Sequence, residues 1–189
     1  MFAMSFHRYC SLLPFDKDIV RLPEETYINA SWLQLNGFKY IATMGPMHNT
    51  CPDFWKMVWV TDAKIVVMLC RYGCSKYFPT DVGETQVHGN YKVTCDFIRV
   101  ENDDFIEREL SVATVSQIDE KTPKNVTHLQ FKTWPNYGVP QGNQTKYPSL
   151  FYMNEILHYI LSILTHIKKL GPKAIAGFIE HVRDCTTKR

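Results

Sequence analysis

The most informative stretch of the sequence reads His128-Leu-Gln-Phe131-Lys-Thr-Trp134-Pro135-Asn136-Tyr-Gly138-Val139-Pro140. Its first part alternates between apolar and polar residues, as expected of a β-strand that ends near Phe131. The remainder is rich in Pro, Asn and Gly, which favour turns. The stretch therefore predicts a strand that leads into an irregular loop.

Further strands are predicted upstream of this loop. Ile65–Cys70 is a continuous apolar run led by β-branched residues, which indicates a strand covered on both faces. Shorter strands are expected at Tyr91–Cys95, Phe97–Val100, Phe105–Val115 and Val126–Phe131.

Two helices are predicted around them. Thr50 is expected to cap a helix that buries Phe54, Met57 and Val58, with Asp53 as its capping-box partner. The other helix, near Pro148–Leu170, has polar groups at its centre and reads as amphipathic rather than membrane-spanning. It ends at a Gly-Pro pair, and Lys173–His181 follows as a candidate last strand, in which Ala174–Ile179 could substitute for a missing central one.

The composition indicates one globular domain over residues 1–189, since 45% of the residues are hydrophobic and 13% aromatic. A net charge of +2 gives no reason to expect nucleic acid or a membrane surface as a partner. The six cysteines have no tight framework of spacings, so we expect reduced thiols and a cytoplasmic location. We expect no cofactor and no metal, because the cysteine spacing of Cys70 and Cys74 is a weak metal motif.

The order of several motifs resembles the classical protein tyrosine phosphatase family over nearly the whole chain. The segments that carry this resemblance are Arg8-Tyr9, Tyr27-Ile28-Asn29-Ala30, Tyr40-Ile41-Ala42-Thr43-Met44-Gly45-Pro46, Asn49-Thr50-Cys51, Phe54-Trp55-Lys56-Met57-Val58-Trp59, Lys76-Tyr77-Phe78-Pro79 and Trp134-Pro135. The resemblance implies an α/β fold with a highly twisted mixed sheet flanked by helices. It also implies that the C-terminal part, with the catalytic loop and the helices that follow, is missing here.

The resemblance assigns Trp134, Pro135 and Asn136 to a degenerate general-acid loop, because the family carries Asp where this chain has Asn136. An amide has no proton to donate near neutral pH, and general acid–base catalysis is typically worth about 10²–10⁴ in rate. Tyr9 stands where the family stacks an aromatic ring on phosphotyrosine. Without a phosphate site, Tyr9 could equally pack on its own loop, and Trp134 and Pro135 could serve only as packing and turn residues. For His128 we expect a hydrogen-bonded structural role.

The family's nucleophile is a cysteine in a Cys-x5-Arg loop, which this sequence does not contain. The sixth residue after the first five cysteines is Asp16, Met57, Lys76, Thr80 and Glu101 in turn, and Cys185 has only four residues after it. No catalytic residue is therefore assigned.

These observations predict a catalytically inactive phosphatase-like protein, a decoy or competitor that binds phosphotyrosine proteins or the partners of active phosphatases. The sequence is similar to the phosphatase-like proteins of polydnaviruses (bracoviruses), which would place it in the cytoplasm of infected insect host cells. Two alternatives remain open. The chain could be a truncated product of an active phosphatase gene, or a decayed product without function.

Overall fold

The computed structural model describes residues 14–35, 38–69, 74–101, 105–115, 122–132 and 175–178. Within them one mixed sheet carries one α-helix, α1, at Cys51–Thr61. The strands are β1 (Ala30–Leu35), β2 (Phe38–Thr43), β3 (Ile65–Met68), β4 (Thr85–His88), β5 (Tyr91–Glu101), β6 (Phe105–Thr114), β7 (Lys124–Phe131) and β8 (Ile175–Phe178).

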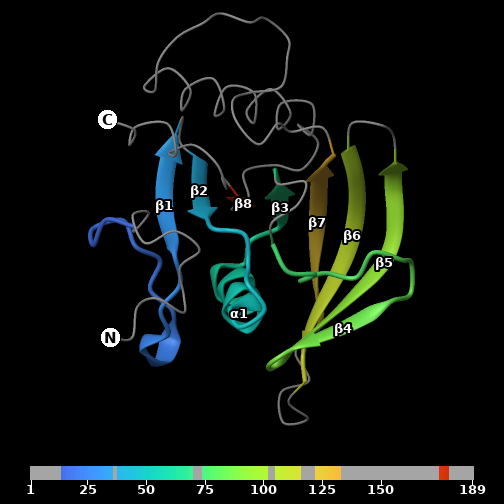
Figure 1. Cartoon of the computed structure of the whole chain (residues 1–189), viewed down its shortest axis with the longest axis horizontal. Coiled ribbons are helices and arrows are strands. Elements are labelled where there is room, and N and C mark those ends of the chain that lie inside the picture. The colour runs from blue at the N-terminus through green and yellow to red at the C-terminus, as the bar shows by residue number, and fades with distance from the viewer. Residues whose placement is uncertain are drawn as a thin grey trace, which may run out of the picture.

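The strand order across the sheet is β1-β2-β8-β3-β7-β6-β5-β4. The four strands in the middle of this order, β2, β8, β3 and β7, are parallel, and the remaining neighbours pair antiparallel. Figure 1 shows the strong twist between β1 and β5, with α1 near the middle of the sheet. The expected twisted mixed α/β sheet is confirmed.

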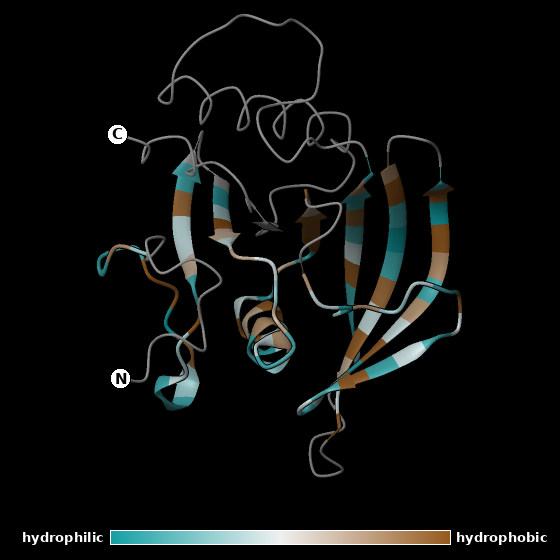
Figure 2. Cartoon of the chain, in the orientation of Figure 1, coloured by the Kyte–Doolittle hydropathy of each residue, from teal (hydrophilic) through white to brown (hydrophobic). Residues whose placement is uncertain are grey.

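The core lies between α1 and the sheet. Trp55, Met57 and Val58 are buried on α1, and they belong to the same apolar cluster as Val66 of β3 and Leu110 of β6. As Figure 2 shows, β3 is hydrophobic throughout, whereas β5 and β6 alternate. The difference follows from burial of the two faces of each strand: β3 is buried at every residue and so on both faces, while β5 and β6 keep one polar face.

The predicted start of the helix at Thr50 is correct, but the predicted capping box is wrong. The Thr50 side chain makes no cap hydrogen bond to α1. Its hydroxyl instead accepts a hydrogen bond from the Met47 N–H at 2.9 Å, and the Thr50 N–H donates to the Met47 carbonyl. The Thr50 hydroxyl and N–H, which a capping box would direct to Asp53, are therefore used in a turn with Met47 before the helix.

The strand predictions need three corrections. Tyr91–Cys95 and Phe97–Val100 are one strand, β5, because register shifts between Cys95 and Phe97 and between Ile98 and Val100 bulge it without ending it. The strand predicted at Ile65–Cys70 ends at Met68. Strands β1, β2 and β4 were not predicted as strands, although β1 and β2 contain residues of two family motifs.

At the other end of the chain, the predicted last strand is confirmed as β8 at Ile175–Phe178. The predicted helix near Pro148–Leu170 lies outside the described residues. β8 lies between β2 and β3 and pairs with both in parallel, so it occupies the middle of the sheet.

Candidate functional site

The four parallel strands end together at one edge of the sheet. The register aligns Thr43 of β2, Phe178 of β8, Met68 of β3 and Gln130 of β7. In open α/β sheets, ligands bind outside the carboxyl ends of the parallel strands. This edge is therefore the candidate site.

The predicted acid loop follows directly from this edge in the sequence. β7 ends at Phe131, so the chain leaves the sheet just before the Trp134-Pro135-Asn136 segment. Trp134, Pro135 and Asn136 themselves lie outside the described residues, and so does Tyr9. The structure thus describes the strand that leads to the predicted loop, and the roles of the four residues stay predictions.

A small hollow lies beside the end of β2, where the chain turns toward α1. Two family motifs build it, since the Thr43 hydroxyl donates to the Asn29 carbonyl at 3.0 Å and the Met44 N–H donates to the same oxygen at 3.2 Å. The residues that line the hollow are Tyr27, Ile28, Asn29, Thr43, Met44, Pro46, Thr50 and Phe54. These bonds hold the Tyr27–Asn29 segment against the carboxyl end of β2.

Beneath the site, a buried polar network joins β7 to the Lys76–Pro79 segment. The Tyr77 hydroxyl and His128 Nε2 lie 2.7 Å apart, and the Trp55 indole N–H donates to the Tyr77 carbonyl at 2.7 Å. The His128 ring also packs against the Phe78 ring at a centroid distance of 4.1 Å. His128 is completely buried, so the expected hydrogen-bonded structural histidine is confirmed.

Burial, reinforced by the positive charge of Arg108, lowers the pKa of His128 to about 3. The ring is therefore neutral at physiological pH and is a poor proton donor. Its Nδ1 atom is buried and has no hydrogen-bond partner in the described part of the chain. The network thus positions the segment around Tyr77 and supplies no acid.

This network also contains a buried arginine that was not predicted from the sequence. Arg108 of β6 donates to Gln130 Oε1 at 3.0 Å, makes a longer bond to the Thr80 carbonyl at 3.4 Å, and lies 5.3 Å above the Phe78 ring. Burial lowers the pKa of its guanidinium. The signal was present in the sequence, because Arg108 stands between Ile106 and Leu110 on the alternating apolar face of β6.

Two classes of feature are not seen in the described ranges. No three His, Cys, Asp or Glu side chains there are grouped so that they could hold a metal ion. No helix in those ranges has the length and apolar character needed to cross a bilayer.

Comparison with known proteins supports the family resemblance. Residues 3–162 match the family described as protein-tyrosine phosphatase. The chain is 38% identical over 152 residues to receptor-type tyrosine-protein phosphatase C of Rattus norvegicus, which covers 71% of this chain and 12% of that protein. It is 39% identical over 120 residues to tyrosine-protein phosphatase 2 of Dictyostelium discoideum, which covers 60% of this chain and 30% of that protein.

The fold comparison agrees. A solved structure from work on PTPN18 and distinct HER2 tyrosine phosphorylation sites superposes with a TM-score of 0.72 at 26% identity, covering 92% of this chain and 60% of that one. The chain thus spans about an eighth of the receptor-type relative and three fifths of the solved structure. On the extent of the family match and the shared fold, this chain belongs to the protein-tyrosine phosphatase family.

Proposed function

We propose that the chain Met1–Arg189 is a catalytically inactive phosphatase-like protein that binds phosphotyrosine proteins, or the partners of active phosphatases, in the cytoplasm. One observation carries the proposal: Asn136 stands in the position of the general acid, and no cysteine in these 189 residues is followed by Arg at the sixth position. Nucleophile and acid act as a unit, and loss of the nucleophile alone removes most of the rate.

The framework around the candidate site supports a binding role. Family motifs build the hollow beside β2, and Tyr77 of another family motif makes the buried bond with His128. Both lie near the common carboxyl edge of the four parallel strands. A scaffold of this kind can bind a phosphorylated ligand without hydrolysing it. The work on PTPN18 concerns tyrosine phosphorylation sites, which makes a phosphotyrosyl peptide the natural first ligand to try. The proposal also includes a role as a competitor in host signalling, which is the role expected of a polydnavirus phosphatase-like protein.

The proposal is tested with the purified chain in two assays. A phosphotyrosyl peptide should bind more tightly than the same peptide with unmodified tyrosine, and Tyr9→Ala should weaken that binding about tenfold, or roughly 1.4 kcal/mol. Phe15→Ala is the matched control, because Phe15 is an exposed aromatic residue, and it should change nothing. Equal affinity for the two peptides would count against phosphotyrosine binding.

The second assay measures hydrolysis. The chain should cleave aryl phosphates and phosphotyrosyl peptides no faster than a heat-inactivated sample, and Asn136→Asp should not change this. Proton donation helps only when a nucleophile already lies in line with the phosphate. Vanadate-sensitive turnover that follows the purified protein, in either form, would refute catalytic inactivity.

The share of its relatives that this chain spans favours a second candidate, a segment of an active phosphatase. In that case the nucleotide sequence beyond the codon for Arg189, or in another frame after Pro172, should encode a Cys-x5-Arg loop. A longer product with that loop would gain activity on Asn136→Asp, which separates the second candidate from the first.

A further inference from the structure

We propose that Cys51 and Cys74 form a redox-sensitive pair that closes to a reversible intramolecular disulfide when the protein meets hydrogen peroxide. This site is independent of the proposed function. Cys51 is the first residue of α1, and Cys74 lies on the segment that leads to Tyr77.

Backbone contacts bring the two cysteines to the same corner of the fold. The N–H of Ser75, the neighbour of Cys74, donates to the Pro46 carbonyl at 2.8 Å. The next carbonyl, that of Met47, accepts bonds from the Cys51 N–H at 3.1 Å and the Cys51 thiol at 3.3 Å. The turn at Pro46 and Met47 therefore contacts both cysteine segments at once.

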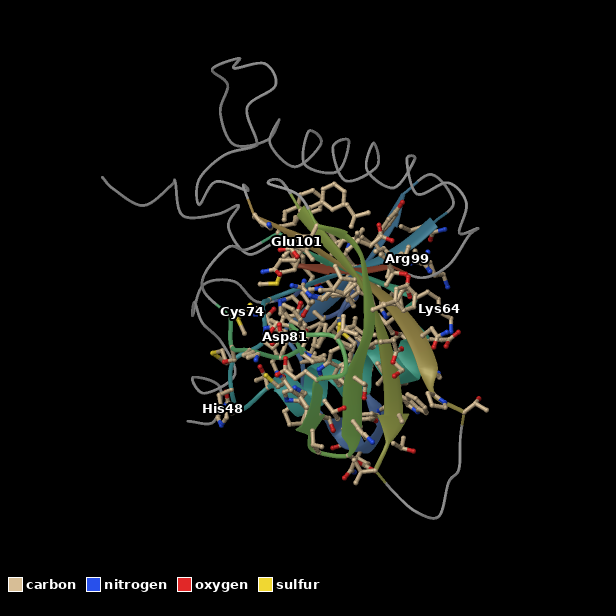
Figure 3. The ribbon with its side chains drawn as sticks, turned by 90° about the vertical axis from the view of Figure 1, so that its right-hand side faces the viewer. His48, Lys64, Cys74, Asp81, Arg99 and Glu101 are labelled. Atoms are coloured by element: carbon tan, nitrogen blue, oxygen red, sulfur yellow. The ribbon has the colours of Figure 1, made fainter. Side chains whose placement is uncertain are left out.

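Side-chain packing agrees with this placement. Cys51 belongs to the buried core cluster, and Cys74 packs against that cluster from its partly exposed edge. In Figure 3, Cys74 lies on the same side of the molecule as His48, which belongs to the turn next to Cys51. Cys95, by contrast, is completely buried on β5.

Electrostatics assigns different roles to the two thiols. A place at the N-terminus of a helix lowers a thiol pKa, but here burial dominates, and together with the nearby Cys74 it raises the pKa of Cys51 to about 11. Cys51 thus stays protonated and is shielded from oxidants. Cys74 is the more exposed of the two, so peroxide reaches it first.

The chemistry balances with peroxide as the only co-reactant. The Cys74 sulfur attacks one peroxide oxygen, the O–O bond breaks, and water leaves after proton transfer, giving a sulfenic acid. The Cys51 sulfur then attacks the Cys74 sulfur and loses its proton, while the hydroxyl of the sulfenic acid leaves as a second water. Two thiols are oxidised to one disulfide, and one peroxide is reduced to two waters.

The test is peptide mapping of the whole chain after mild peroxide treatment under native conditions. Trypsin should place each relevant cysteine on its own peptide: Cys51 on Tyr40–Lys56, Cys70 on Ile65–Arg71, Cys74 on Tyr72–Lys76 and Cys95 on Val93–Arg99. We expect Tyr40–Lys56 to be joined to Tyr72–Lys76, lighter than the sum of the two peptides by two hydrogens, and the link to disappear on reduction with dithiothreitol.

Three variants keep the test decisive. Cys74→Ala should abolish the link, and because Cys74 is only partly buried this variant should fold. Cys95→Ala and Cys70→Ala should leave the link in place. The proposal is overturned if Cys51 and Cys74 are both recovered as free thiols, or if Cys74 pairs mainly with Cys70. It is also overturned if the same mixture of links forms in concentrated urea as in buffer. A selective link requires the native fold to hold the two Cα atoms about 4.4–6.8 Å apart.

Discussion

At the scale of single residues, His128 shows how burial decides what a titratable group can do. Its ring lies between Tyr77 and Phe78 and is shielded from water, which disfavours the charged form. A histidine just before an acid loop would be an attractive candidate for proton transfer in a sequence. The structure makes it a neutral positioning group instead.

Removing the hydroxyl that faces this ring should destabilise the fold. Tyr77→Phe deletes the partner of His128 Nε2 inside the core, and an unsatisfied buried polar group costs about 1–3 kcal/mol. Urea unfolding should show this loss. Tyr91→Phe is the control, because Tyr91 is only partly buried and should lose well under about 1 kcal/mol. Equal small losses in the two variants would show that the bond contributes little.

The same ring predicts a pH dependence of stability. The pKa of His128 is lowered to about 3 in the fold, against about 6.5 in an unfolded chain, so the unfolded state binds more protons between these values. The stabilisation is complete above about pH 6.5 and is lost as the pH falls toward 3. His88, whose pKa burial also lowers, acts in the same direction.

Unfolding midpoints between pH 5 and pH 7 isolate this effect, since most carboxylates stay ionised there. The midpoint should fall as the pH is lowered, and His88→Gln should retain most of the slope. A wild-type midpoint that does not change over this range would contradict the burial argument for His128.

At the scale of elements, the turn of the β4–β5 hairpin packs closely against the Pro52 side chain at the start of α1. Gly89 in its turn has a φ of +58°, and a Cβ built there would lie 3.0 Å from Pro52 Cβ. Gly83, before β4, also has a positive φ of +83°, but a Cβ built there meets nothing within 4 Å. Substitution at Gly83 therefore tests backbone strain alone, whereas substitution at Gly89 tests backbone strain together with the contact to Pro52.

Gly83→Ala and Gly89→Ala should accordingly differ in cost. Each forces alanine into the left-handed region, for about 1–2 kcal/mol. Gly89→Ala must also push against Pro52, which adds the roughly 1–3 kcal/mol typical of overpacking. Thermal and urea unfolding of both variants measure the difference. If Gly83→Ala proves as costly as Gly89→Ala, the contact with α1 does not constrain the hairpin.

At the scale of the whole molecule, the sheet is continuous only because of β8. β2 and β3 do not pair with each other, and each pairs with β8. Without β8, the described strands would form two separate sheets, β1-β2 and β3-β7-β6-β5-β4. Each would expose an open strand edge, and such edges promote aggregation or binding to other chains.

A proline in β8 should therefore damage the entire fold. Ala176 pairs with Ile41 on one side and Val66 on the other, and Ala176→Pro removes a backbone donor from the centre of the sheet. We expect thermal unfolding to lose its cooperativity. Sedimentation should show aggregates in place of the monomer, because the open edges of β2 and β3 would associate.

The matched control is Val87→Pro on the edge strand β4. The Cys95 N–H donates to the Glu84 carbonyl, and in antiparallel strands hydrogen-bonded pairs alternate with pairs that are not bonded to each other. Counting along β4 from Glu84, Val87 and Lys92 form a pair without mutual hydrogen bonds, so the Val87 N–H points away from β5. This variant should remain folded and monomeric. A monomeric Ala176→Pro protein with an unchanged melt would show that β8 is dispensable.

Local pattern was enough to predict the helix start at Thr50, the fully buried strand that begins at Ile65 and a last strand within Lys173–His181, because each depends on propensity and periodicity over a few neighbouring residues. The family resemblance, the Asn at position 136 and the absence of a Cys-x5-Arg spacing are likewise read from the sequence alone. Only the tertiary structure decided that β5 is one bulged strand, that Arg108 is buried over Phe78, that Cys51 and Cys74 share a corner, and that β8 joins β2 to β3. These features arise from contacts between segments far apart in the chain, whose energies depend on pairing, packing and exclusion of water rather than on local sequence.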